Sequence, residues 1–216
     1  MTFEPDMAIL PQPQRALWAE LVAVPARYVL YGGTALALRL GHRSSADFDF
    51  FAHDPLNHRE LESIPFVADG RTIQEGPNER SVLVDRGGSV KISFFGGLAF
   101  GRVGAPDRTT DGVLRAASLL DLAGTKIKAL LQRIEAKDYR DVAALIEAGT
   151  PLVAILGAAQ TLFDPTFNHL VAQKALSYFE GGDLASLDDH VRTLLTASAG
   201  RDLQVEPLAR TSLRLD

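Results

Sequence analysis

Residues 28–51 read YVLYGGTALALRLGHRSSADFDFF and combine three local patterns. The run from Arg27 to Tyr31 is rich in β-forming residues and is closed by two glycines, and the run from Thr34 to Leu40 strongly favours a helix. From Asp47 to Phe51, acidic and aromatic residues alternate with the period of a strand. The stretch therefore predicts a strand, a glycine turn, a helix and a second strand, in that order.

The glycine turn is a candidate phosphate-binding site. Gly32 and Gly33 let the backbone come close to a ligand, and the helix that starts at Thr34 offers unpaired N–H groups and a positive dipole end. Ser45 and Arg43 follow the helix and can add further polar contacts. Glycines that serve turn geometry alone remain the alternative.

The pair Asp47 and Asp49 is a candidate metal site. Residues two apart on a strand point to the same side, so both carboxylates share one face, about 7 Å apart, while Phe48 lies on the other. Such a pair suits a hard cation such as Mg²⁺ or Mn²⁺, and a solvated strand face is the alternative. A calcium loop of the EF-hand type is excluded because Phe51 stands where a third oxygen ligand is needed.

The two features gain meaning together. If the two strands are neighbours, the glycine turn lies beside the carboxylate pair, an arrangement that suits a nucleoside triphosphate whose phosphates are bridged by Mg²⁺. Such a site favours in-line displacement at phosphorus.

The remaining chain changes character near residue 113. A helix is expected from Gln14 to about Val24, and strands are expected at 81–84 and 89–95 around a turn at 85–88. From Arg115 onward the chain is rich in Ala and Leu at helical spacing, and strand signals vanish. We expect an α/β domain over residues 1–113 and a helical domain over 114–216.

A basic segment lies in the helical part. Lys126, Arg133 and Lys137 share one face if a single helix runs through them, and that positive stripe could meet a triphosphate or an RNA backbone. A solvated basic face is the alternative. Asp138 could cap a following helix, and Asp141 could pair with Lys137 at i, i+4.

Two motifs resemble a known family. Residues 31–51 resemble the first motif of nucleotidyltransferase-fold proteins, most closely the AbiEii/AbiGii-type nucleotidyltransferase toxins. Residues 117–126, with Arg133 and the segment 137–142, are similar to that family's lysine-bearing helical motif. The resemblance implies an α+β fold, with a nucleotidyltransferase-like (polymerase beta-like) mixed β-sheet domain followed by a helical C-terminal domain.

The resemblance also implies roles for individual residues. Asp47 and Asp49 would be catalytic metal ligands, Lys126 would contact the nucleotide, and Asp138 would support the site. The residues expected to bind the nucleotide are Gly32, Gly33, Thr34, Ser45, Lys91 and Arg133.

One position departs from the family pattern. Nucleotidyltransferase-fold enzymes commonly carry a third carboxylate on a later strand, where it can act as a base. The expected strand is Val90–Phe95, on which Lys91 and Ser93 share a face. Ser93 stands where an acid is expected, and serine is a poor base and a poor metal ligand. Asp69 or Asp85 could supply the carboxylate from elsewhere in the chain.

Composition limits the chemistry and the setting. The 216 residues are 46% hydrophobic and carry a net charge of −5, which argues against a protein that coats DNA generically. The absence of cysteine excludes disulfides, thiol nucleophiles and Fe–S clusters. No apolar run is long enough for a membrane helix, and the start resembles no secretory signal. We expect a cytoplasmic protein with no membrane partner.

The resulting hypothesis is an Mg²⁺-dependent enzyme that moves a nucleoside monophosphate from an NTP to a hydroxyl acceptor. The resemblance implies that the acceptor is a tRNA 3′ end or a protein, and that the enzyme is a toxin with a cognate antitoxin, in a toxin–antitoxin or phage-defence system. The alternative is a catalytically degenerate module that binds nucleotide or a partner protein. A glycosyltransferase that uses D-x-D for a nucleotide sugar is a third hypothesis, against which the motif at 117–141 argues.

Overall fold

The computed structural model describes residues 1–216 and divides them into two compact units. The first contains Met1–Ser118 and Ser212–Asp216, and the second contains Leu119–Thr211. The sequence places a domain boundary between residues 113 and 114, whereas the units divide after Ser118. The reason is local: Arg115–Ala116 still form a strand of the first unit's sheet.

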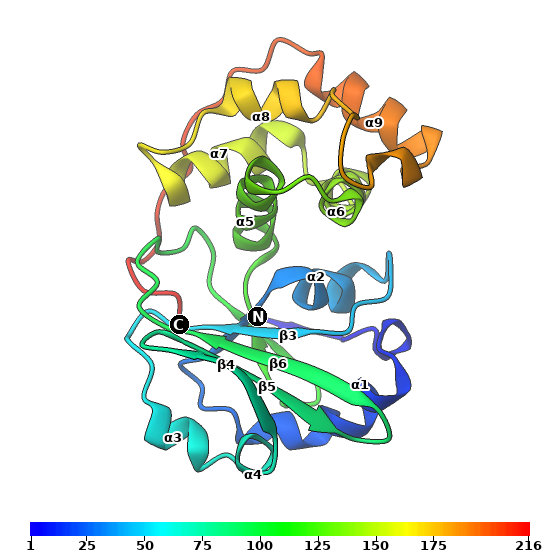
Figure 1. The fold of residues 1–216 in the computed structure, drawn as a ribbon. Coiled ribbons are helices and arrows are strands. Elements are labelled where there is room, and N and C mark those ends of the chain that lie inside the picture. Colours follow the sequence, from blue (N-terminus) through cyan, green and yellow to red (C-terminus); the bar gives the residue numbers. More distant parts are fainter. The chain divides into compact units, whose positions relative to one another are not determined.

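The first unit is built on a mixed eight-stranded sheet in the order β1-β7-β8-β2-β3-β6-β5-β4 (Figure 1). Three strand pairs are parallel, namely β1–β7, β2–β8 and β3–β6. The strands are β1 Thr2–Phe3, β2 Val29–Tyr31, β3 Phe48–Phe51, β4 Arg71–Gly76, β5 Glu79–Asp85, β6 Ser89–Phe95, β7 Asp107–Thr109 and β8 Arg115–Ala116. This mixed sheet, together with the helices of both units, confirms the predicted α+β class.

The order of elements predicted around the two glycines is confirmed. β2 runs directly into α2 (Gly32–Leu40), and the chain returns as β3 antiparallel to β2. The helix ends at Gly41, whose φ of 64° is the left-handed conformation that glycine adopts at low cost. Tyr31, the last residue before the glycines, lies opposite Asp49 in the register.

Alternation along β3 and β6 separates a core face from a mixed face, which carries Asp49 and Ser93 together with Phe51 and Phe95. Phe48, Phe50, Ile92 and Phe94 are fully buried, and the Phe50 and Phe94 rings stack at 5.4 Å. Trp18 contacts Phe48 on that face, and Figure 1 shows α1, α3 and α4 on one side of the sheet and α2 on the other. Asp49 and Ser93 therefore lie on the face opposite the phenylalanine core.

Short helices cover the core face. They are α1 Gln12–Leu17, η2 Trp18–Ala23, α3 His58–Glu62 and α4 Pro65–Ala68, whereas η1 Met7–Ile9 lies against α2. The single helix expected over residues 14–24 is wrong in detail, since α1 begins at Gln12 and the chain tightens into the 3-10 segment η2 at Trp18. Leu17 and Leu21 remain fully buried through this change.

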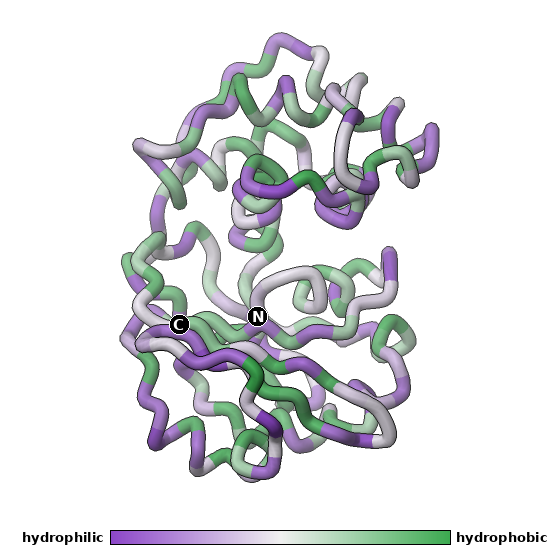
Figure 2. The backbone as a smooth tube through the Cα atoms, in the orientation of Figure 1, coloured by the Kyte–Doolittle hydropathy of each residue, from purple (hydrophilic) through white to green (hydrophobic).

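The second unit is entirely helical. Its elements are α5 Leu119–Gln132, α6 Ala136–Glu147, α7 Leu152–Phe163, α8 His169–Ala175, η3 Leu184–Ser186 and α9 Asp189–Ala199. Hydrophobic and hydrophilic stretches alternate along these helices (Figure 2), as amphipathic packing requires. α5 and α7 pack closely at Gly124, where an added Cβ would lie 2.9 Å from Leu162 Cδ1. None of the helices in the chain combines the length and hydropathy needed to span a bilayer.

Candidate functional site

The carboxylate of Asp49 rests directly on the glycine turn. A Cβ placed on Gly32 would lie 2.8 Å from Asp49 Oδ2, closer than a real Cβ contact permits. Gly32 also has a φ of 75°, which disfavours any side chain. Both constraints require glycine at this position. The close approach places the Asp49 carboxylate, a metal-binding type of side chain, against the first turn of α2.

The loop between α2 and β3 folds back over the same helix end. The Thr34 hydroxyl donates to the carbonyl oxygen of Asp47 and is hydrogen-bonded with Ser45 Oγ at 2.8 Å. Thr34 is almost completely buried, so its hydroxyl holds the loop in place. The structure thus brings Gly32, Gly33, Thr34, Ser45 and Asp49 together in one region of the first unit.

Asp47 and Asp49 can offer oxygen ligands from one side of the sheet. Asp47 is exposed just before β3, and Asp49 is half-buried within the strand. No group of three or more His, Asp or Glu side chains is placed so that it could hold a metal ion, so a cation here would take its other ligands from phosphate and water. Mg²⁺ commonly binds in that way, through one or two carboxylates and substrate phosphates. The donor set therefore fits a hard divalent cation.

Ser93 occupies the position opposite Asp49. In the parallel pairing of β3 with β6, Asp49 and Ser93 are register partners, so the strand expected to carry a third acid lies beside the first two. The Ser93 side chain is fully buried, and its hydroxyl bonds the Ser81 hydroxyl at 3.0 Å. A neutral hydroxyl pair replaces the acid at this place in the sheet.

Lys91 lies two residues before Ser93 on the same face of β6. Its side chain is half-buried, and its register partner on β5 is Leu83. Because Asp47 precedes the β3 residue paired with Ile92, Lys91 and Asp47 lie at adjacent positions of neighbouring strands. Lys91 thus contributes a positive charge to the face that carries the two aspartates.

In the helical unit, the predicted residues gather around a buried ion-pair cluster. The Lys126 amine lies 3.1 Å from Asp138 Oδ1 and 2.6 Å from Asp141 Oδ2, and all three side chains are withdrawn from solvent. Arg133 grips the same Asp138 carboxylate with two nitrogens, at 2.7 and 3.1 Å. Burial, together with the nearby charge of Asp138, raises the pKa of Tyr139. Asp141, for which the sequence suggests Lys137 as the ion-pair partner, joins this cluster through Lys126 instead.

The basic stripe that one continuous helix would give is not formed. α5 ends at Gln132 and α6 begins at Ala136, so Lys126, Arg133 and Lys137 do not share one helical face. Lys137 pairs with Glu135 at 2.7 Å instead of with Asp141. The break turns Arg133 toward Asp138, and carboxylates neutralise most of the expected positive charge.

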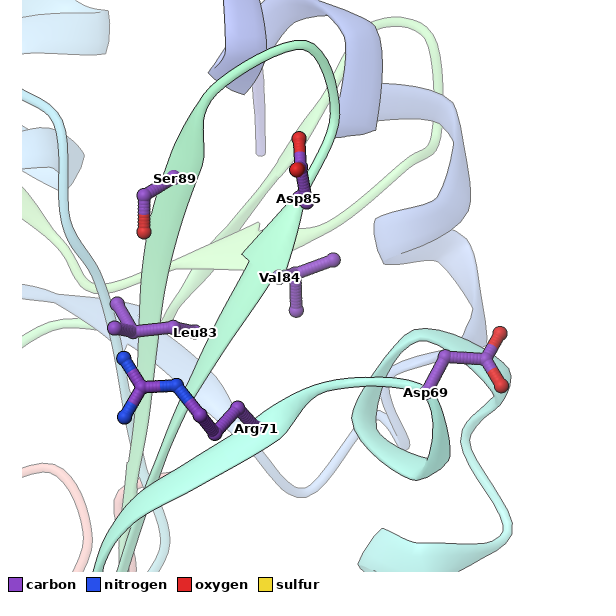
Figure 3. Close-up of a pocket in the computed structure, with 6 residues that line it drawn as sticks. All are labelled: Asp69, Arg71, Leu83, Val84, Asp85 and Ser89. Carbon is purple, nitrogen blue, oxygen red and sulfur yellow. The ribbon is translucent and has the colours of Figure 1, made fainter.

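A separate cavity of about 290 Å³ lies at the far edge of the sheet. Figure 3 shows Asp85 and Ser89 near the β5–β6 turn, Arg71 and Leu83 along the strands, and Asp69 in the link before β4. Asp69 and Asp85, the alternative positions for a third carboxylate, line this cavity, whereas none of the residues predicted to bind metal or nucleotide does. The glycine turn and its carboxylates therefore remain the candidate site.

Comparison with known proteins agrees with this geometry. A model of the family described as nucleotidyl transferase AbiEii toxin, of a type IV toxin–antitoxin system, matches residues 15–202. The fold is similar to a crystal structure from H. pylori described as that of a candidate nucleotidyltransferase, with a TM-score of 0.58, 18% identity and coverage of 88% of this chain and 91% of that one. It is also similar to MenT4, a nucleotidyltransferase toxin from Mycobacterium tuberculosis, with a TM-score of 0.52, 13% identity and coverage of 86% and 85%.

Sequence similarity extends to an uncharacterised protein of Aquifex aeolicus, which is 31% identical over 121 residues. The match covers 53% of this chain and 55% of the relative, so the chain spans about half the length of that protein. The solved structures establish the nucleotidyltransferase fold, and the family model spans both the D-x-D segment and the lysine-bearing helices. The chain therefore belongs to the AbiEii nucleotidyltransferase toxin family.

Proposed function

We propose that this protein is a nucleotidyltransferase toxin that moves a nucleoside monophosphate from an NTP to a hydroxyl acceptor with the help of Mg²⁺ or Mn²⁺. The observation that carries the proposal is the contact between the Asp49 carboxylate and the glycine turn at the start of α2. A carboxylate that can hold a cation and a backbone that can accept phosphate are adjacent within one rigid strand–turn–helix unit.

In the proposed reaction, the acceptor oxygen forms a bond to the α-phosphorus while the bond from that phosphorus to the bridging oxygen breaks. Pyrophosphate leaves with the electron pair, and the acceptor proton passes to solvent. A divalent cation supplies charge neutralisation on the phosphates. Asp47 and Asp49 hold it, Gly32, Gly33 and Thr34 bind phosphate oxygens, and Ser45 and Lys91 add polar contacts.

The helical motif completes the proposal. Lys126 and Arg133 are assigned to nucleotide binding, and Asp138 is assigned to support of the site. The reason is that the family match spans this motif as well as the D-x-D segment. The cluster itself holds Lys126 in a fixed position through Asp138 and Asp141. The acceptor is a tRNA 3′ end or a protein hydroxyl, the setting is the cytoplasm, and a cognate antitoxin is the expected partner.

A label-transfer assay tests the proposal. The full-length protein is incubated with each α-labelled NTP, Mg²⁺ or Mn²⁺, and either total tRNA or cell protein. We expect label on one acceptor class, and we expect the Asp47→Asn/Asp49→Asn double variant to lose it. Transfer that survives in the double variant would show that these carboxylates are not the metal ligands.

A second function is favoured by one specific observation. Ser93 replaces the expected acid beside Asp49, so the fold can also serve as a module that binds nucleotide or a partner protein without turnover. Binding of a Mg²⁺–NTP complex without transfer to either acceptor class would support this function over the first.

A further inference from the structure

Arg43 lies against the second glycine of the turn. A Cβ on Gly33 would lie 2.4 Å from Arg43 Nη2 and 3.4 Å from its Cζ, so the guanidinium occupies the space that a side chain would need. Another of its nitrogens donates to the Ser44 carbonyl oxygen at 3.0 Å, which holds the arginine folded back onto its own loop. The position of the guanidinium is therefore tied to the loop that Thr34 anchors.

The placement brings two positive groups together. α2 is nine residues long, and its first turn presents N–H groups and the positive end of the helix dipole. An arginine is normally favoured at the opposite end of a helix, where the dipole is negative. The guanidinium beside Gly33 therefore adds N–H donors that can bind an anion at this end of the helix.

The neighbouring Gly32 is in contact with a side chain of the opposite charge. Asp49 Oδ2 lies on Gly32 as Arg43 lies on Gly33, so a carboxylate and a guanidinium flank consecutive residues of one turn. A Mg²⁺–triphosphate has matching parts, with a cation for the carboxylate and free anionic oxygens for the guanidinium. Arginine also suits phosphate because its fork of N–H donors can bind two oxygens at once.

We propose that Arg43 binds the triphosphate oxygens that the metal ion leaves free and so selects a pyrophosphate-bearing nucleotide at the glycine turn. This inference rests on the proposed function, because it assigns a further binding residue to the same site. Arg43 acts on the β- and γ-phosphates, which leave together as pyrophosphate, and it makes no contact with the nucleoside.

Equilibrium binding without an acceptor tests the inference. Calorimetry is used to compare the native protein with Arg43→Gln, Arg43→Lys and Arg59→Gln. Arg59 is an exposed residue of α3, so Arg59→Gln is a control for the loss of one charge. The probes are the four common Mg²⁺–NTP complexes, Mg²⁺–pyrophosphate and the corresponding nucleoside monophosphates, and a melting curve checks the fold of each variant.

We expect Arg43→Gln to weaken NTP and pyrophosphate binding on the order of tenfold and monophosphate binding by less than about threefold. Arg43→Lys keeps the charge and should recover part of the loss. If Arg43→Gln binds every probe as Arg59→Gln does, Arg43 has no such role. A native protein that binds none of the four Mg²⁺–NTP complexes contradicts the proposed function itself.

Gly33→Ala provides an independent variant. Its methyl group must displace the Arg43 guanidinium, the end of a flexible side chain, and Gly33 is not in the left-handed region, so the fold is expected to persist. Gly33→Ala should weaken pyrophosphate binding, and adding Arg43→Gln should cause no further loss. Pyrophosphate binding that stays unchanged in Gly33→Ala would overturn the inference, since displacing the guanidinium would then cost no affinity.

Discussion

The amine of Lys126 lies 2.6 Å from the Asp141 carboxylate in the interior of the helical unit. Replacing Lys126 with Met leaves the buried carboxylates of Asp138 and Asp141 without their shared cation. We expect a loss of about 3–5 kcal/mol in the free energy of unfolding, because breaking a buried ion pair leaves an uncompensated charge in the poorly polarisable interior of the protein. Urea denaturation at neutral pH measures it.

Lys137 is the matched control for that variant. It pairs with Glu135 at the surface, and its side chain is half exposed. Lys137→Met should cost less than about 1 kcal/mol. Equal losses in the two variants would mean that the cluster around Lys126 contributes no more than a surface pair.

Gly32 and Gly112 allow conformational strain to be separated from contact. Their φ values are 75° and 74°, but a Cβ on Gly112 meets nothing within 4 Å whereas one on Gly32 meets Asp49. Each alanine variant should lose about 1–2 kcal/mol through backbone strain. Gly32→Ala should lose more and should also weaken Mg²⁺-dependent nucleotide binding, as thermal unfolding and calorimetry can measure. Identical stability in both variants would contradict the close approach of Asp49.

Ser93→Asp tests the consequence of the missing acid. A carboxylate in this fully buried position faces Asp49 across β3 and β6, so without metal we expect a loss of roughly 2–4 kcal/mol. Mg²⁺ should restore stability in Ser93→Asp more than in the native protein, because a third carboxylate strengthens the cation site. Melting temperatures with and without Mg²⁺ measure the difference, and Ser93→Asn serves as the uncharged control. If Mg²⁺ raises the melting temperature of Ser93→Asp no more than that of Ser93→Asn, the cation does not bind beside residue 93.

The segment 212–216 should loosen in acid. Arg214 grips Asp54 at 2.7 and 3.1 Å, and this hydrogen bonding, aided by the arginine charge, lowers the pKa of Asp54 below its ordinary value of 3.8. Because the folded pKa is the lower one, the contribution is complete above the ordinary value and is lost as pH falls through the folded value. The methyl NMR signals of Leu215, which is fully buried, should therefore shift only below about pH 4.

Asp54→Asn removes the charge at every pH. In this variant we expect the Leu215 signals to differ from those of the native protein already at neutral pH and to show no transition in acid. An unchanged acid transition would assign it to another carboxylate.

Local signals were sufficient for the part of the fold that carries the site. The glycine pair, the helix-forming run and the D-x-D alternation are each encoded within a few residues, so β2, α2 and β3 could be predicted in order. The family resemblance implies that Ser93 lies beside Asp49, and the alternation along β6 indicates only the face on which Ser93 lies.

The missed elements depend on distant pairing. β4 is exposed along almost its whole length and lacks alternation, so it becomes a strand only by pairing with β5. β7 and β8 have three and two residues, too few for any period to show. The sequence predicts a new helix near Asp138, and α6 is present there, but it does not predict that α5 ends at Gln132. The ion pairs of Asp138 with Lys126 and Arg133 could not be predicted either, because they depend on how the two helices pack.

The return of residues 212–216 to the sheet unit affects the order in which the protein can be completed during synthesis. Leu215 is fully buried, Arg214 binds Asp54, and Ser212 pairs with Arg102, yet every residue of the helical unit is translated before them. Domains usually finish folding from the N-terminus as the chain emerges from the ribosome. Here the helical unit can be complete while the sheet unit still waits for its last contacts, so the unit that carries Asp49 is the last to become complete.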